Sequence, residues 1–199
     1  MLWSPAYRAE VSRKVLHLAS AAIPTVYLLV ERPLMLCLLL PCVLIAIVVE
    51  TLRFASPRFA AGFRTAVGFM VRAVEWQRLT GATYVLVASI LAVYLFPKPV
   101  AIAALFIMSV SDSAASLMGI TFGRTRFLGK SLAGSGSFFV TAVAILWLHW
   151  PAAKGVGVLV ACVATLAEAI PTVKLGLFEL NDNLTVPLLT GAALVALLP

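Results

Sequence analysis

Long apolar runs separated by short basic segments are the main feature of this chain. A transmembrane helix needs roughly 20 apolar residues to cross about 30 Å of hydrocarbon, and its backbone polar groups must bond internally. On that basis the runs predict helices at residues 15–30, 33–51, 82–96, 99–120, 134–150, 154–170 and 184–199. The sequence therefore predicts an all-α fold, a polytopic membrane helix bundle with about seven transmembrane helices.

Composition supports a multi-pass integral membrane protein. The 199 residues are 62% hydrophobic and 12% charged, whereas soluble proteins average about 45–50% apolar and about 25% charged residues. No large polar segment interrupts the apolar runs, so we expect residues 1–199 to form a single integral-membrane domain. The N-terminal segment lacks the cleavage-site pattern of a signal peptide, and we expect it to be retained.

Basic residues alternate in density between successive connecting segments. A net charge of +7 would suggest nucleic acid as a partner of a soluble protein, but here it reads as a topology signal. One set of segments holds only Arg32, Lys98 and Lys154, whereas the other 12 of the 15 basic residues lie in the alternate set. We therefore expect a cytosolic N-terminus, a C-terminus on the opposite face, and no nucleic-acid partner.

The longest connection, residues 53–81, carries apolar residues at helical spacing. Phe59, Phe63 and Val67 recur against Arg64 and Arg78. This pattern is typical of a helix lying at the membrane interface. A short cytosolic helix packed on the bundle explains it equally well.

Acidic residues gather at one side of the predicted bundle. Charges near the ends of membrane helices are costly, so such residues are functional candidates. Six lie at or near predicted cytosolic helix ends: Glu10, Glu50, Glu75, Asp112, Glu168 and Asp182. Mg²⁺ prefers oxygen ligands, and phosphates bind Lys, Arg and backbone N–H groups. With the neighbouring basic residues, these carboxylates indicate a metal and polyphosphate site.

The strongest local signal lies in residues 111–137. From Asp112 onward, small residues recur every three or four positions, giving a helix face that another backbone can approach. Packing alone explains the glycines, but a carboxylate on such a face needs a cation or a donor. The basic, Gly/Ser-rich loop that follows leads into a helix whose N-terminus favours phosphate. The candidate nucleotide ligands here are Gly119, Gly123, Arg124, Lys130, Ser131, Gly134 and Ser135.

A charged face is also predicted near the N-terminus. Glu10, Arg13, Lys14 and His17 are spaced to share one side of a helix. A juxtamembrane basic anchor with a hydrogen-bonded histidine would give the same pattern. The alternative is that Arg13, Lys14 and His17 bind nucleotide.

A last polar pair, Asp182 and Asn183, comes just before the final apolar run. Such a pair can cap a helix, or it can supply two oxygen ligands on the same side as Asp112. We leave both possibilities open at this point.

Five motifs, taken in order, resemble the dolichol kinase, phytol kinase and CTP-dependent diacylglycerol kinase family of membrane lipid kinases. They are E-V-S-R-K-V-L-H (10–17), E-W-Q-R-L-T-G-A-T (75–83), D-S-A-A-S-L-M-G-I-T-F-G (112–123), K-S-L-A-G-S (130–135), and Glu168 followed by D-N-L-T-V-P (182–187). The resemblance spans nearly the whole chain. It implies transfer of the γ-phosphate of CTP to the hydroxyl of a membrane lipid alcohol, such as a polyprenol, a phytol-like isoprenoid or diacylglycerol, at a site facing the cytosol.

We assign roles to the candidate residues on this basis. Asp112, Lys130 and Asp182 are the predicted catalytic residues, and Mg²⁺ is expected at Asp112, Glu168, Asp182 and Asn183. Further candidates are Glu10, Glu50, Glu75 and Thr80. The family pattern has Glu where this chain has Ala133, so the role of that acid is unfilled here or falls to another carboxylate such as Glu75 or Glu168.

Other functions are compatible with parts of this pattern. A phosphatidate cytidylyltransferase also joins CTP to a membrane lipid, but it attacks the α-phosphate and releases pyrophosphate. A CDP-alcohol phosphotransferase needs several aspartates on consecutive turns, and none occurs between Asp112 and Asp182. A small transporter is disfavoured because transport sites lie near the bilayer midplane, whereas these charges cluster at one surface. Neither the lipid alcohol nor the oligomeric state follows from the residues.

Overall fold

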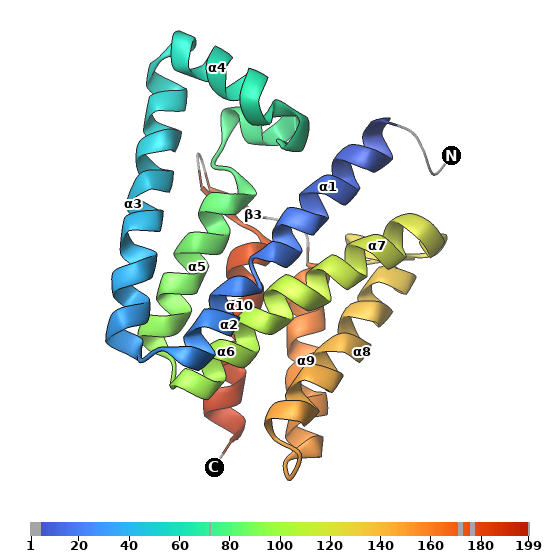
Figure 1. Ribbon diagram of the computed structural model, residues 1–199. Coiled ribbons are helices and arrows are strands. Elements are labelled where there is room, and N and C mark those ends of the chain that lie inside the picture. The colour runs from blue at the N-terminus through green and yellow to red at the C-terminus, as the bar shows by residue number, and fades with distance from the viewer. Residues whose placement is uncertain (1–4, 72, 171–172, 176–177, 199) are drawn as a thin grey trace.

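The computed structural model describes residues 5–71, 73–170, 173–175 and 178–198, apart from the side chains of residues 5–10, 73–74, 173–175 and 178–179. These residues form a helical bundle with two short β hairpins (Figure 1). The helices are α1 (Pro5–Ala19), α2 (Ala22–Leu29), α3 (Arg32–Ala55), α4 (Pro57–Val67), η1 (Gly68–Met70), η2 (Ala73–Gln77), α5 (Gly81–Leu95), α6 (Lys98–Phe106), η3 (Ile107–Ser111), α7 (Asp112–Phe122), α8 (Leu132–His149), α9 (Lys154–Ala169) and α10 (Asp182–Leu197). The strands are β1 (Arg126–Phe127), β2 (Lys130–Ser131), β3 (Val173–Leu175) and β4 (Phe178–Leu180).

Helix α3 shows why this chain belongs in a membrane. Its 24 residues extend about 36 Å at 1.5 Å per residue, enough to cross about 30 Å of hydrocarbon. Its outward face carries large apolar side chains such as Leu44 and Ile45, which are 54% and 63% exposed. The joined helix Lys98–Phe122 and α8 are also long and apolar enough to span, and α5 and α10 are shorter apolar helices. The chain is therefore an integral membrane helix bundle, while seven spans with a cytosolic N-terminus remain a prediction.

The first predicted span, residues 15–30, is wrong as a single helix. α1 ends at Ala19 and α2 begins at Ala22. Pro24 explains the break, because it has no N–H for the carbonyl of Ser20 and its ring would clash there in a continuous helix. The eight residues of α2 reach only about 12 Å, too short to cross the hydrocarbon. Each of the other six predicted ranges coincides with one helix or with the joined helix α6–α7.

Two antiparallel hairpins, β1–β2 and β3–β4, lie where the sequence predicts loops. In the first, Phe127 lies opposite Lys130, and Leu128 at the turn has φ of 49°. The N–H of Gly129 donates to the carbonyl of Ala169 at 3.1 Å. This hydrogen bond ties the first hairpin to the end of α9, and so fixes where Lys130 lies.

Two apolar cores hold the bundle together. One lies among α2, α3, α5 and α6 and includes Tyr27 and Tyr84, and the other lies among α6, α8, α9 and α10 and includes Phe138 and Leu146. All four of these side chains are at most 2% exposed. Helix α6 contributes to both cores, as expected for a helix that is apolar on every face.

The segment 53–81 is not one helix. Arg53 still belongs to α3, and α4 begins at Pro57 after Ser56, whose hydroxyl accepts a hydrogen bond from the N–H of Phe59 at 3.3 Å. This is a favourable helix start. α4 then crosses over the end of the bundle at a steep angle to α3 (Figure 1). The amphipathic pattern therefore marks a helix that covers one end of the molecule.

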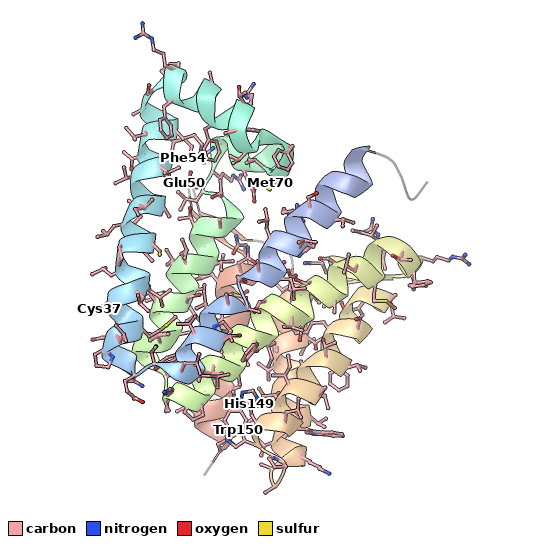
Figure 2. The ribbon with its side chains drawn as sticks, viewed as in Figure 1. Cys37, Glu50, Phe54, Met70, His149 and Trp150 are labelled. Carbon is pink, nitrogen blue, oxygen red and sulfur yellow. The ribbon has the colours of Figure 1, made fainter. Side chains whose placement is uncertain are left out.

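The two ends of the bundle differ in chemistry. The turns that carry Arg32, Lys98 and Lys154 gather at the end where the C-terminus lies, and α4 and the N-terminus lie at the other (Figure 1). Figure 2 shows Glu50 and Met70 near the α4 end, whereas His149 and Trp150 lie at the opposite end. The arrangement agrees with the predicted grouping of the connecting segments.

Candidate active site

A cavity of about 600 Å³ lies where α1, α3, α4, α5, α7 and α10 come together. Its size is typical of a small-molecule site, about 300–1,000 Å³. The predicted site residues that line it are Arg13, Lys14, His17, Glu50, Glu75, Thr80, Asp112, Lys130, Asp182 and Asn183. The structure thus brings together residues from the two ends and the middle of the sequence.

The walls of this cavity differ in chemistry. Helices α1, α7 and α10 and strand β2 supply most of the charged lining, whereas α3, α4, η1 and the later part of α5 supply an apolar wall. The apolar lining includes Ala46, Val49, Phe63, Val67, Met70, Val85 and Leu86. The sequence pattern marked Phe63 and Val67 only as one face of an amphipathic helix, because periodicity does not say what a helix face covers. A cavity of this kind suits an amphipathic ligand.

Asp112 occupies the first position of α7, directly after the π-helical turn η3. Such π turns are rare and are found often at functional sites. The Asp112 side chain is 6% exposed and forms an ion pair with Lys14, and the same oxygen lies 3.2 Å from Nε2 of His17. That nitrogen is also 3.1 Å from the carbonyl oxygen of Met108. α1 therefore places two basic side chains against one buried carboxylate.

Lys130, on strand β2, forms ion pairs with acidic residues of two helices. Its Nζ lies 2.8 Å from Asp182 of α10 and 3.1 Å from Glu168 of α9. Burial by itself would lower the pKa of Lys130, but Asp182 and Glu168 outweigh it and raise that pKa above its ordinary value. Lys130 therefore remains an ammonium group at the cavity wall.

Glu168 lies behind Lys130. It is 2% exposed and accepts a hydrogen bond from the hydroxyl of Ser135 at 3.3 Å. Within the described part of the chain, Glu168 and Ser135 are not among the residues that line the cavity. Their position suits them to orient Lys130, and a direct metal or nucleotide contact for them stays a prediction.

A buried ion pair that includes Arg53, which sequence reasoning did not single out, holds the segment before α5. We call residues 75–80 the strap. Arg53 and Glu50 are 5% and 4% exposed, and Nε of Arg53 lies 2.9 Å from Oε2 of Glu50. Arg53 also donates hydrogen bonds to three strap carbonyls, those of Glu75, Trp76 and Arg78. A basic residue at the end of an apolar run resembles a topology charge, so the pattern hid this role.

The strap in turn positions Glu75 at the cavity. Glu50 accepts hydrogen bonds from the N–H of Thr80 at 2.7 Å and from the hydroxyl of Thr83 at 3.0 Å. The N–H of Gly81 donates to Glu75 at 3.1 Å. Glu50 bonds with Arg53, Thr80 and Thr83. Its role in the candidate site is therefore to hold the strap in position.

Three glycines predicted to contact phosphate lie between α7 and α8. A Cβ at Gly134 would come within 2.9 Å of the carbonyl oxygen of Ala115, and one at Gly123 within 2.2 Å of the carbonyl oxygen of Gly119. Gly119 and Gly134 therefore allow α7 and α8 to approach closely, and Gly123 fits the tight end of α7. None of the three is among the described residues that line the cavity.

Three other candidates are not seen at the cavity: Ser131 and Arg124 do not line it, and the side chain of Glu10 is not described. The hydroxyl of Ser131 caps α8 by accepting a hydrogen bond from the N–H of Gly134 at 3.1 Å. Arg124 is exposed. The side chain of Glu10 lies outside the described part of α1. Nucleotide contacts for these residues stay predictions.

The carboxylate oxygens of the cavity suit a metal ion that is also held by the phosphates of a substrate. Among the described residues, no three His, Cys, Asp or Glu side chains form a cluster that could hold a metal ion. Mg²⁺, however, commonly takes one or two protein carboxylates and completes its shell with phosphates and water. Asp112 and Asp182 line the same cavity, and Pro187 cannot donate to the carbonyl of Asn183. Hard oxygen donors of the type that Mg²⁺ prefers are therefore present.

Several proteins with related sequences are named as lipid kinases. The chain is 27% identical over 212 residues to CTP-dependent diacylglycerol kinase 1 of Saccharomyces cerevisiae, a match that covers 92% of this chain and 71% of the relative. It is 30% identical to the enzyme of that name from Eremothecium gossypii, over 92% of this chain and 65% of the relative. A probable chloroplastic phytol kinase of Triticum aestivum is 30% identical over 57% of this chain and 43% of its own length. By sequence, the chain is therefore similar to this family of lipid kinases.

The similarity to these lipid kinases confirms the resemblance carried by the five motifs. No family model matches the chain. No solved structure matches it either. The site described above therefore rests on the geometry of this chain itself.

Proposed function

We propose that this protein transfers the γ-phosphate of CTP to the hydroxyl of a membrane lipid alcohol. The observation that supports this most directly is the single cavity that joins Asp112, Lys130 and Asp182 to an apolar wall. A nucleotide needs the charged part, and a lipid needs the apolar part. The names of the relatives support CTP as the donor and a lipid as the acceptor.

The basic residues of the cavity suit a polyphosphate. Lys14 is paired with Asp112, and Lys130 is paired with Asp182 and Glu168, so the cations are held in place before a nucleotide binds. Phosphate oxygens would compete with these carboxylates for the same ammonium groups. Phosphoryl transfer depends mainly on positioning and on neutralising charge. We assign that task to Lys130, with Lys14 and Arg13 as further nucleotide contacts.

The bond changes follow from a direct transfer. The lipid hydroxyl oxygen forms a bond to the γ-phosphorus, the bond from that phosphorus to the β–γ bridging oxygen breaks, and CDP leaves. The hydroxyl proton passes to a carboxylate of the cavity, for which Asp112 and Asp182 are the candidates. Mg²⁺, held by Asp112 and Asp182 with help from Asn183, would neutralise phosphate charge when bound with the nucleotide.

The same cavity suits a lipid acceptor. Its apolar wall on α3, α4 and α5 includes Val49, Phe63 and Leu86. α3 and α5 are apolar helices of the membrane bundle, so a lipid can present its hydroxyl to the charged wall while its hydrocarbon stays in an apolar environment. With the predicted topology, this places the reaction at the cytosolic surface of the membrane.

Purified protein and γ-labelled CTP test this proposal. We expect label in the lipid fraction with at least one acceptor from a panel of polyprenol, phytol and diacylglycerol, and CDP as the second product. Asp112→Asn, which keeps the side-chain shape and removes the charge, is the matched control and should transfer label at least about 100-fold more slowly. With phosphatidate added as a further acceptor, release of pyrophosphate and formation of a CDP-lipid would instead indicate a cytidylyltransferase. Absence of transfer to every acceptor would contradict the proposal.

A further inference from the structure

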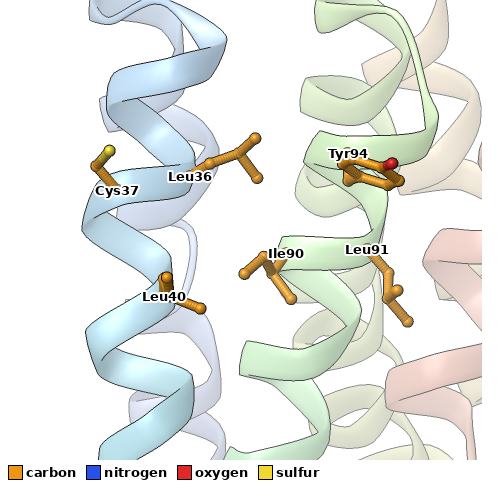
Figure 3. Close-up of a pocket in the computed structure, with 6 residues that line it drawn as sticks. All are labelled: Leu36, Cys37, Leu40, Ile90, Leu91 and Tyr94. Carbon is orange, nitrogen blue, oxygen red and sulfur yellow. The ribbon is translucent and has the colours of Figure 1, made fainter.

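A second cavity, of about 410 Å³, lies between α3 and α5. We call it the α3–α5 groove. It is lined by Leu36, Cys37, Leu40, Ile90, Leu91 and Tyr94. Figure 3 shows Leu36 and Leu40 extending from α3 toward α5, and Ile90 extending from α5 toward α3. The groove has an almost wholly apolar lining and lies between two apolar helices of the membrane bundle.

The α3–α5 groove continues the cavity of the candidate active site along the same two helices. On α5, residues at four-residue intervals line first one cavity and then the other: Ala82, Leu86, Ile90 and Tyr94. On α3, Ala46 lines the active-site cavity and Leu40 lines the groove. Residues four apart share one helix face, so the two cavities follow one another along the same face of α5, at its seam with α3.

This seam runs along almost the whole of α5, and one lipid tail is long enough to follow most of it. Ala82 and Tyr94 are separated by about 18 Å along α5 at 1.5 Å per residue. One leaflet contributes about half of the roughly 30 Å of hydrocarbon. A lipid with its hydroxyl at the charged wall would therefore lay its hydrocarbon chain along the seam and reach the groove.

We infer that the hydrocarbon tail of the lipid substrate runs from the active-site cavity along α3 and α5 into the α3–α5 groove. The inference rests on the proposed function. It makes this groove the part of the enzyme that senses tail length. An acceptor with a short tail would occupy only the cavity, and an acceptor with a long tail would gain further contacts in the groove.

A pair of leucines on α3 allows a matched test. Leu40 lines the groove and is 50% exposed, whereas Leu38 is 46% exposed and lines neither cavity. Two residues apart on a helix, they face in nearly opposite directions. Leu40→Trp places a large ring in the groove, and Leu38→Trp places the same ring on the other side of α3.

The assay compares long and short acceptors of whichever class the wild-type enzyme phosphorylates, dioleoylglycerol with dioctanoylglycerol, or phytol with geraniol. Leu40→Trp should lower kcat/KM for the long acceptor by at least about tenfold, the loss expected when two methylene groups lose their burial. The value for the short acceptor should stay unchanged. Leu38→Trp should change neither value.

Other outcomes separate this inference from the proposed function. Equal losses for both acceptors, or no loss for either, would overturn the assignment of the groove while leaving the kinase activity intact. A wild-type protein that phosphorylates no acceptor would remove the proposed function itself, and with it the basis of the inference.

Photo-crosslinking of the wild-type protein provides a second measurement that needs no variant. A long-chain acceptor with a diazirine at the end of its tail should label residues 36–40 and 90–94, and unlabelled long-chain acceptor should compete. Labelling spread evenly over the exposed face of the bundle would mean that bulk lipid fills the groove. Crosslinks between two copies of the chain at α3 and α5 would assign the groove to a dimer interface. Either of these two results would overturn the inference.

Discussion

Replacing Lys130 by methionine removes one ammonium group and keeps most of the side-chain volume. In the structure this ammonium lies 2.8 Å from Asp182 and 3.1 Å from Glu168. If it neutralises the transferring phosphate, its loss should lower kcat by about 100- to 1,000-fold, the effect of removing one group that stabilises transition-state charge. The affinity for CTP should change less than kcat.

Lys130→Met should also lower stability, and the size of this effect follows from the same contacts. The Glu168 side chain is 3% exposed and would lose its ion partner. A hydrogen bond to a charged group contributes about 1.5–3 kcal/mol. There are two such contacts, but the Lys130 side chain is 35% exposed, and solvent weakens exposed pairs. We therefore expect the free energy of unfolding to fall by about 2–3 kcal/mol in total.

A double variant separates the chemical role of Lys130 from its structural role. Lys130→Met with Glu168→Gln removes the buried negative charge, and the amide can still bond Ser135, so much of the lost stability should return. Turnover should not return. The assay is label transfer from CTP to lipid together with thermal unfolding in detergent, with exposed Lys154→Met at the opposite end of the bundle as control. Recovery of near wild-type turnover in the double variant would refute a direct role of Lys130 in phosphoryl transfer.

Further variants test Asp112, Arg53 and Gly123, and reporter fusions test the topology. Asp112→Asn should lower turnover by at least about 100-fold and abolish its Mg²⁺ dependence, measured by titrating Mg²⁺, and an unchanged Mg²⁺ optimum would exclude Asp112 as a ligand. Arg53→Met leaves Glu50 buried without its ion partner and should destabilise the protein by about 3–5 kcal/mol, which thermal unfolding can measure. Gly123→Ala should cost about 1–3 kcal/mol through overpacking, whereas Gly136→Ala, where a Cβ meets nothing within 4 Å, should be neutral or stabilising. A reporter fused after Arg126 should be cytosolic and one fused at the C-terminus should lie on the far side.

The sequence predicts most helices correctly because hydrophobic length is a strong signal in lipid. The ranges 33–51 and 134–150 coincide with α3 and α8. The break between α1 and α2 was also present in the sequence, since Pro24 cannot continue a helix, but the apolar run masked it. The two hairpins have strands of two or three residues, too short to give a recognisable alternation of apolar and polar positions.

Parts of the candidate site could be predicted because a charged residue beside a membrane helix costs free energy, so each such residue in an apolar chain needs a reason. Asp112, Lys130 and Asp182 are such residues, and the structure brings all three to one cavity. Sequence alone could not separate lining residues from packing ones, since Gly123 fits a phosphate loop and a close helix contact equally well. Nor could it find Arg53, because its partners are backbone carbonyls of the strap.

The most direct test of the central claim follows two labels on CTP through one reaction. Wild-type protein receives a lipid acceptor and CTP labelled at either the α- or the γ-phosphate. A kinase built on this cavity should move only the γ-label into the lipid fraction and leave the α-label in CDP. Transfer of the α-label to lipid, with release of pyrophosphate, or no transfer of either label to any acceptor in the panel, would contradict the claim.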